Sequence, residues 1–307
     1  MVSRPGRARS AREKEGSDVP KDRPTPPTVR SRRLAAELRR LREAAGLTRE
    51  QVSTQTGINP ATLYRHETAT ARSRPQRRTM IALLNLYGAT DQQREDLLAL
   101  SREVDVQGWL RPYHAELPEP YTTYISFEAE ARAVRNYESL FIPGLLQTED
   151  YARAVIRGNL PMATPTQVDQ RVQARMERQV VLSKDSPLQL WAIVDEAALH
   201  RQVGGAAVMR SQLEKLLETA EQPHVTVQVI PYAAGAHGGM QGSYILLDFP
   251  NSADPAVVYV ESMAGDLFLE AEADIRRYSL VFDTLRAQAL SPDDTAGLIT
   301  NVAAGRQ

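Results

Sequence analysis

Three side chains that can form hydrogen bonds or stack on flat rings lie close together in the chain, at Thr62, Tyr64 and Arg65. The arginine fork can donate two parallel hydrogen bonds, for example to O6 and N7 of a guanine base. A threonine hydroxyl can bond to a phosphate or to a base edge, and the small Ala61 beside it permits close approach and contact with a thymine methyl. Presented together on one helix, these groups suit the major groove of double-stranded DNA, which admits an α-helix.

The segment that carries these residues has the signals of a short helix at about 59–67. Asn59 is a preferred N-cap, and Pro60 occupies the first helical position, where its missing N–H costs nothing. Ile58 can pack against Leu63 as a hydrophobic staple, and Leu63 is the one core-facing residue in the middle of the helix. A helix this short is not stable alone, so neighbouring helices must hold it in place.

The flanking residues supply such neighbours. Leucines spaced at i, i+4 and i+7 predict a helix over about 32–45. Thr48 and Gln51 form a predicted capping box at the start of a second helix, and another helix is expected over about 76–87. These elements predict an all-α helix-turn-helix domain that spans residues 31–104.

Further arginines near this helix pair can attract the DNA backbone. Arg49 stands at the start of the second helix, where it can grip a phosphate beside the positive end of the helix dipole. The loop TATARSRPQRR would add attraction that does not depend on base sequence, through Arg72, Arg74, Arg77 and Arg78. The alternatives are that this polar face is merely solvated or that the helix pair binds a protein. Taken together, the candidate DNA contacts are Arg49, Asn59, Pro60, Ala61, Thr62, Tyr64, Arg65, Arg72, Arg74 and Arg77.

The charge of the chain is divided between its two parts. Residues 1–78 contain 19 Lys+Arg and 8 Asp+Glu, and the remainder contains 18 and 30, so charges of +11 and −12 add up to −1. A basic end joined to an acidic body is typical of proteins that bind a polyanion, although a basic tail can also serve only to solvate a chain. Residues 1–30 are rich in Arg, Pro and Ser, and we expect them to form a disordered basic tail.

The composition favours no catalytic or metal chemistry. The chain has no cysteine, and its five histidines lack the spacing of metal ligands. The glycine-rich stretch AAGAHGGMQG is not followed by Lys–Ser/Thr, so it is predicted to connect strands, with a lid over a ligand or partner as the alternative. The adjacent carboxylates Asp195 and Glu196 are interpreted as a helix start. We therefore expect no catalytic residue, metal or cofactor; an enzyme with a DNA-binding appendage is the least favoured reading.

The acidic part is expected to form a second domain over 124–300, after a linker at 105–123. Residues 127–158 read as two helices around a Pro–Gly break. The later segments VTVQVIPY, SYILLDF, AVVYVES and DLFLE read as strands joined by short turns. These patterns predict an α+β domain with a mainly antiparallel sheet and helices packed against it. No apolar run approaches the ~20 residues that cross a bilayer, and no secretory signal begins the chain, so a cytoplasmic protein is expected.

The stretch LRRLREAAGLTREQVSTQTGINPATLYRHET resembles the Xre-type, or phage-repressor-like, helix-turn-helix family. The family pairs an arginine of the first helix with a glutamate at the end of the third. The resemblance therefore implies a structural ion pair between Arg42 and Glu67, rather than DNA contacts by these two residues.

Motifs of the second domain carry another resemblance. FIPGLLQTEDYARAVIRG, VDEAALHRQVGG and VTVQVIPYAAGAHGGMQGSYILLDFP look like the C-terminal domain of unknown function found in actinobacterial antitoxin-like regulators. This resemblance implies a transcriptional regulator in which the C-terminal domain receives a signal from a ligand or from a small protein encoded nearby. We expect a nucleoid-associated homodimer that binds a pseudo-palindromic site in double-stranded DNA. The alternative is an antitoxin-like module whose main role is to bind the small partner protein.

Overall fold

The computed structural model describes residues 29–68, 75–101, 117–251, 254–263 and 265–305. Almost all of the predicted tail at 1–30 and most of the predicted linker at 105–123 lie outside these ranges. The same holds for Arg72 and Arg74, so the predictions made for them stay predictions.

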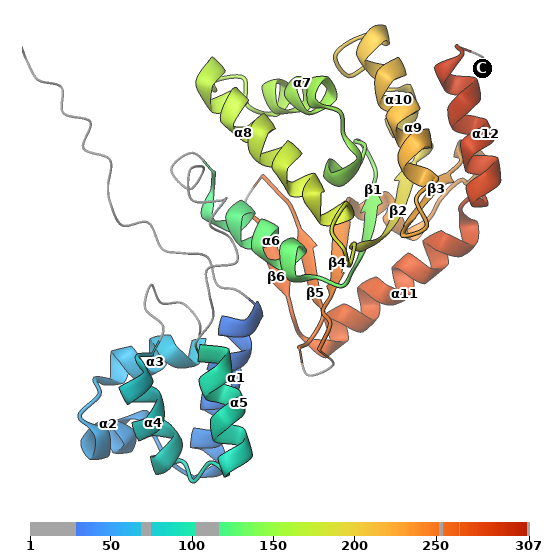
Figure 1. Cartoon of the computed structure of the whole chain (residues 1–307). Coiled ribbons are helices and arrows are strands. Elements are labelled where there is room, and N and C mark those ends of the chain that lie inside the picture. The colour runs from blue at the N-terminus through green and yellow to red at the C-terminus, as the bar shows by residue number, and fades with distance from the viewer. Residues whose placement is uncertain (1–28, 69–74, 102–116, 252–253, 264, 306–307) are drawn as a thin grey trace, which may run out of the picture.

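The described part of the N-terminal domain consists of the helices α1 (Val29–Ala44), α2 (Arg49–Thr56), α3 (Pro60–Thr68), α4 (Arg77–Leu86) and α5 (Asp91–Ser101), which Figure 1 shows grouped together. Their apolar faces meet in one core of their own. Its most buried side chains are Leu34, Leu38, Leu41, Val52, Leu63, Met80, Leu83, Leu84 and Leu97. The predicted helical domain is therefore present, with α2 and α3 as the helix-turn-helix pair.

Local capping fixes where α2 and α3 begin and end. The Thr48 side chain accepts a hydrogen bond from the backbone N–H of Gln51, and the Gln51 side chain accepts one from the N–H of Thr48. Gly57 ends α2 with a φ of 72°, a left-handed conformation that favours glycine. Asn59 Oδ1 accepts from the backbone N–H of Ala61 at 2.8 Å, which completes the N-terminus of α3.

The second domain is built on a six-stranded sheet with the order β3-β2-β1-β4-β5-β6. The strands are β1 (Ala133–Glu138), β2 (Gln189–Asp195), β3 (Val225–Ile230), β4 (Tyr244–Asp248), β5 (Val257–Val260) and β6 (Leu267–Leu269). The pairs β1–β2 and β2–β3 are parallel, and the three other pairs are antiparallel. The predicted α+β class is confirmed, with the qualification that the sheet is mixed. The parallel pairs arise because helices, rather than tight turns, connect these strands.

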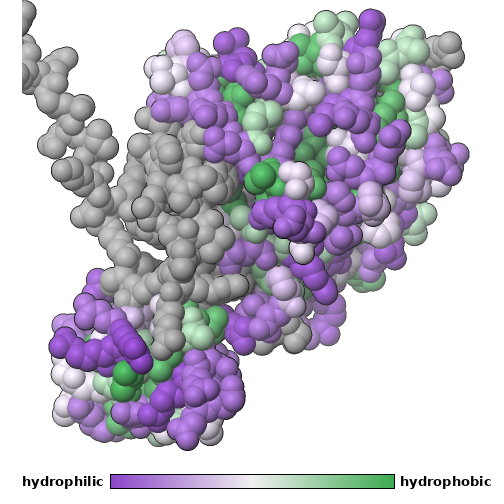
Figure 2. Space-filling model, in the orientation of Figure 1, coloured by the Kyte–Doolittle hydropathy of each residue, from purple (hydrophilic) through white to green (hydrophobic). Residues whose placement is uncertain are grey.

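Helices cover both faces of the sheet (Figure 1). On one face the core is closed by α6 (Glu119–Glu130), α7 (Glu149–Asn159), α8 (Pro165–Arg178), α9 (Glu196–His200), α10 (Ala206–Ala220) and α12 (Pro292–Ala303). The other face packs against α11 (Glu272–Gln288). Hydrophilic side chains cover most of the described surface seen in Figure 2. None of the described helices combines the length and apolar character that a bilayer-spanning segment requires.

One expectation about the start of this domain is wrong. Residues 127–158 do not form two helices, because 133–138 are the strand β1 in the middle of the sheet. The polar residues Arg135 and Glu138 obscure the alternation of a strand, and β1 is stabilised by partners distant in sequence on both sides. The helix before it, α6, begins at Glu119, inside the predicted linker.

Candidate nucleic-acid interface

The helix α3 separates a buried side from an exposed side. Leu63 is 1% exposed and packs in the core of the domain. Ala61 and Arg65 are exposed, Tyr64 is 50% exposed, and Thr62 is partly exposed. The side chains that the sequence proposes for base contact thus share one accessible surface on α3.

In the free protein Arg65 lies along its own helix. Its Nη2 donates to Thr62 Oγ1 at 2.9 Å, and its Nε donates to the backbone oxygen of Ala61 at 3.2 Å. Both hydrogen bonds are exposed to solvent. Replacing one of them with a hydrogen bond to a DNA base costs only about 1 kcal/mol. The guanidinium and hydroxyl are therefore held next to each other and can turn to base edges at small cost.

A buried ion pair fixes the position of α3 against α1. Arg42 donates from Nε to Glu67 Oε1 at 2.6 Å and from Nη2 to Oε2 at 3.1 Å. Its Nη1 donates to the backbone oxygen of Leu47 at 2.7 Å. The hydrogen bond with Glu67 raises the pKa of Arg42 despite the opposing effect of burial. The pair named by the family resemblance is thus a bidentate link between the first and third helices.

Arg49 has a partner that sequence spacing does not reveal. Its Nε donates to Glu67 Oε2 at 2.8 Å, although 18 residues separate the two. Its guanidinium carbon also lies 5.2 Å from the centre of the Tyr64 ring. Its side chain is still 30% exposed. Arg49 therefore orients Glu67 and Tyr64 in the free protein, and its phosphate contact stays a prediction.

The remaining predicted contacts lie at helix starts. Asn59 and Pro60 are exposed at the N-terminus of α3, and Arg77 and Arg78 are exposed in the first turn of α4. Gln76, the residue before α4, makes no side-chain capping hydrogen bond. Phosphates bind well at helix N-termini, so the start of α4 can supplement its two arginines in attracting the DNA backbone.

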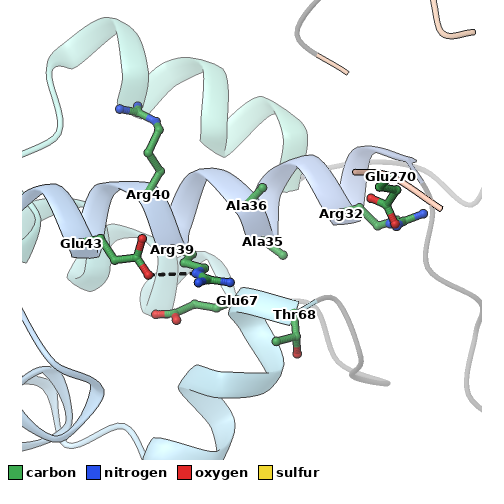
Figure 3. A pocket seen from close by; sticks show the side chains of 9 residues that line it. All are labelled: Arg32, Ala35, Ala36, Arg39, Arg40, Glu43, Glu67, Thr68 and Glu270. Carbon is green, nitrogen blue, oxygen red and sulfur yellow. Dashed lines mark hydrogen bonds and ion pairs between the residues drawn. The ribbon is translucent and has the colours of Figure 1, made fainter. Parts of the chain in front are cut away.

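A pocket along α1 contains three further arginines, but each has a carboxylate partner. Arg39 pairs with Glu43, as the dashed line in Figure 3 shows. Arg40 pairs with Glu37, and Arg32 pairs with Glu270 of the second domain. Ala35 and Ala36 line the pocket between them. Because these guanidinium groups are neutralised locally, we do not assign them to the DNA interface.

In the glycine-rich loop of the second domain, Gly239 is buried and His237 is partly buried, while most of the other residues are exposed. Gly239 donates its N–H to His237 Nδ1 at 3.2 Å, and His237 Nε2 lies 3.3 Å from Asp195 Oδ2. Asp195 also accepts from the N–H of Ala197, so it starts α9 as predicted. Both ring nitrogens of His237 are engaged, and this arrangement presents no free imidazole base. Among the described residues, no three potential ligands converge to hold a metal ion.

Gly239 has no room for a side chain. A Cβ there would lie 2.3 Å from Cζ of Tyr137, a ring with no measurable exposure. We expect Gly239→Ala to lower the free energy of unfolding of the second domain by about 3 kcal/mol through overpacking, measured by urea denaturation. The matched control is Gly158→Ala in α7, where nothing lies within 4 Å of the new methyl. That change should stabilise slightly, and equal behaviour of the two variants would contradict the packing at Gly239.

Two families match the chain. The "Helix-turn-helix domain" family matches residues 33–97, and the "Domain of unknown function (DUF5753)" family matches residues 121–301. No curated protein and no solved structure matches the chain. The first match coincides with α1–α5 and supports DNA binding and the regulation of transcription. The second match covers the sheet and its helices, and the description of this family assigns no function to them.

Proposed function

We propose that this chain, which belongs to the DUF5753 family and carries a helix-turn-helix domain ahead of that region, is a sequence-specific DNA-binding transcription regulator of the Xre type. The observation that supports this proposal most is that α3 is held in a fixed position and keeps a polar face exposed. The buried pair of Arg42 and Glu67 fixes the helix, while Ala61, Thr62 and Arg65 stay accessible on it. A rigidly held helix with an outward polar face is what base readout in the major groove requires.

The charge distribution supports the same proposal. Residues 1–78 carry +11 and the remainder −12, so the DNA-binding end attracts phosphates while the body repels them. We propose that two copies bind a pseudo-palindrome in the nucleoid with half-sites about 34–36 Å apart, one helical turn. The body would then act as the part that senses a ligand or a partner protein.

Base readout and backbone attraction predict different results for two arginines. Arg65→Ala should cost about 1–3 kcal/mol of binding at one base position per half-site and relax the preference there. Arg77→Ala should weaken binding to every sequence alike. It should also reduce by about 1 the magnitude of the slope of the logarithm of the binding constant against the logarithm of the salt concentration. Footprinting and titration against single-base variants of a selected site, at several salt concentrations, measure both effects.

The matched control for these two variants is Arg210→Ala on α10, an exposed arginine far from α3 in the chain. The Arg210→Ala variant should bind DNA with the same affinity as the unchanged protein. If Arg65→Ala loses the same affinity on every sequence, Arg65 has no role in base readout. If the full chain shows no preference among oligonucleotides, the proposed function itself is wrong.

The acidic charge of the body favours one alternative, an antitoxin-like module that mainly binds a small basic protein. Co-expression with proteins encoded nearby, followed by purification of the complex, tests it. The alternative gains support if a small basic protein co-purifies at a fixed ratio and changes DNA affinity. A body that retains none of these proteins would exclude it.

A further inference from the structure

A row of polar residues lies at the carboxyl end of the central strand β1 and beside the neighbouring ends of β4 and β5, on the face of the sheet that packs against α8. Glu138 ends β1, and the register places it opposite Ser243, which precedes β4. Because Tyr259 of β5 pairs with Ile245 of β4, Glu261 stands opposite Ser243 on the other side. Side chains two residues apart in a strand share a face, so Glu138 and Glu261 extend from the same surface.

The topology makes this end of β1 a natural place for a ligand. The chain leaves β1 towards β2 on one side, whereas β4 pairs with β1 on the other side. Because β4 is antiparallel to β1, its amino-terminal end, preceded by Ser243, meets the carboxyl end of β1, where Glu138 lies. In sheets with parallel strands, ligands often bind just beyond the carboxyl ends of the strands.

Glu138 is held in place by its neighbours. Burial raises its pKa to about 7, with a further contribution from the charge of Glu261, while hydrogen bonds from Ser243 and Asn136 and the positive charge of Arg175 oppose the shift. The pKa of Glu261 is also raised, by partial loss of solvent and by the charge of Asp266. The negative charge of Glu261 thus acts on Glu138, while Arg175 is a cation that acts on both carboxyl groups. A further cation beside Glu138 would favour its ionised form.

Two buried polar atoms beside these carboxyl groups lack partners. Asn136 is 4% exposed, and its Oδ1 accepts no hydrogen bond from any described residue, although its side chain bonds to Glu138. Arg175 reaches the same site from α8; its Nη1 donates to Gln147 Oε1 at 3.1 Å, while its buried Nε has no acceptor within the described structure. Leaving such a group unpaired costs about 1–3 kcal/mol. The site therefore offers an acceptor and a donor as well as two carboxylates.

The neighbouring Arg178 does not complete this site, because it is committed to the core. It donates to both carboxylate oxygens of Glu128, at 2.8 and 2.9 Å. A metal ion also fits poorly, since no three carboxylate or imidazole groups of the described residues meet at one point. The acceptors on Glu138, Glu261 and Asn136 instead match an ammonium group, which has three donors.

We propose that this cluster binds a small organic ammonium compound that also carries an acceptor oxygen, the class of amino acids and amino alcohols. The ammonium group donates to Glu138, Glu261 and Asn136 Oδ1, and the oxygen accepts from Arg175 Nε. Binding favours the ionised form of Glu138, so it releases a proton near pH 7. This inference deepens the proposed function by naming the class of ligand. A regulatory role of the ligand rests on the proposed function, whereas the binding of the ligand does not.

Calorimetric titration of the full chain without DNA tests the site. The probes are ethanolamine and glycine, and ethylene glycol and acetate are the matched compounds that lack an ammonium group. We expect at least one of the two amines to bind, with release of a proton that shows as a dependence of the measured heat on the ionisation enthalpy of the buffer. Glu138→Gln should weaken the binding by about tenfold or more, because a charge-assisted hydrogen bond is lost.

Two further variants keep this test decisive. Glu261→Gln changes an exposed side chain, so we expect the fold to tolerate it, and it should also weaken binding. Glu214→Gln, an exposed carboxyl on α10, should bind like the unchanged protein. The proposal is overturned if neither amine binds at millimolar concentration, if the glycol or acetate binds equally well, or if Glu138→Gln leaves the affinity unchanged. Preferential binding of Mg²⁺ or Ca²⁺ would also overturn it. DNA binding is measured separately, so failure of one proposal leaves the other standing.

Discussion

Replacing Glu128 with alanine should lower the free energy of unfolding of the second domain by about 4 kcal/mol. The change leaves Arg178, which is 4% exposed, as a buried charge without its carboxylate partner. It also removes the acceptor of the Tyr124 hydroxyl. The loss is measured by urea denaturation followed by circular dichroism.

The control for Glu128 is Glu149→Ala, which removes an exposed carboxylate from an ion pair with Arg153. That loss should stay below about 1 kcal/mol, because solvent screens the pair. Replacing Glu128 and Arg178 together with methionine should recover much of the stability, since no buried charge then remains. A double variant as unstable as Glu128→Ala would show that the charge imbalance is not the cause.

The second large effect is expected at Glu67. Glu67→Ala leaves both Arg42 and Arg49 without their shared partner and should cost the N-terminal domain about 3–5 kcal/mol. Specific DNA binding should fall with it, because α3 loses its link to α1. Thermal unfolding and a DNA titration of the same preparation measure the two losses together.

Glu43→Ala serves as the comparison, since its carboxylate is about half exposed and pairs mainly with Arg39. Its effect on stability and on DNA binding should be small. The two domains have separate apolar cores, so Glu67→Ala should shift only the transition of the helical domain. A shift of both transitions by the same amount would contradict that separation.

The helical domain is predictable from sequence because its signals are local. Thr48, Gln51, Gly57 and Asn59 each specify a helix boundary through neighbours two to four residues away, and the structure has these boundaries. The strand β1 is different. Its polar residues resemble those of an exposed helix, and its place in the sheet depends on partners in β2 and β4 that local pattern cannot identify.

The same distinction separates the two sites. The face of α3 follows from helical spacing around Leu63, so Thr62 and Arg65 were identifiable from sequence. The contact of Arg49 with Glu67 depends on how α2 and α3 pack, and no spacing rule reveals it. Sequence does not reveal the cluster around Glu138, because its members lie in or beside three strands and on one helix. The pattern of residues 127–158 also predicts helix for the segment that forms β1. Val134, Asn136 and Glu138 share one face of β1, but two of the three are polar, so the segment lacks the apolar–polar alternation that predicts a strand.

The pairing of β1 with β4 sets an order of events during synthesis. Arg135 and Asp248, which form an ion pair across these strands, are 113 residues apart. The helical domain needs only contacts within its first hundred or so residues, and such local structure forms fast and early on the ribosome. A chain that stops before β4 therefore carries a complete helix-turn-helix domain beside a sheet in which β1 pairs on one side only, with β2. If the proposed function holds, such a product would bind DNA without a complete second domain, so complete translation is a condition for any regulation by that domain.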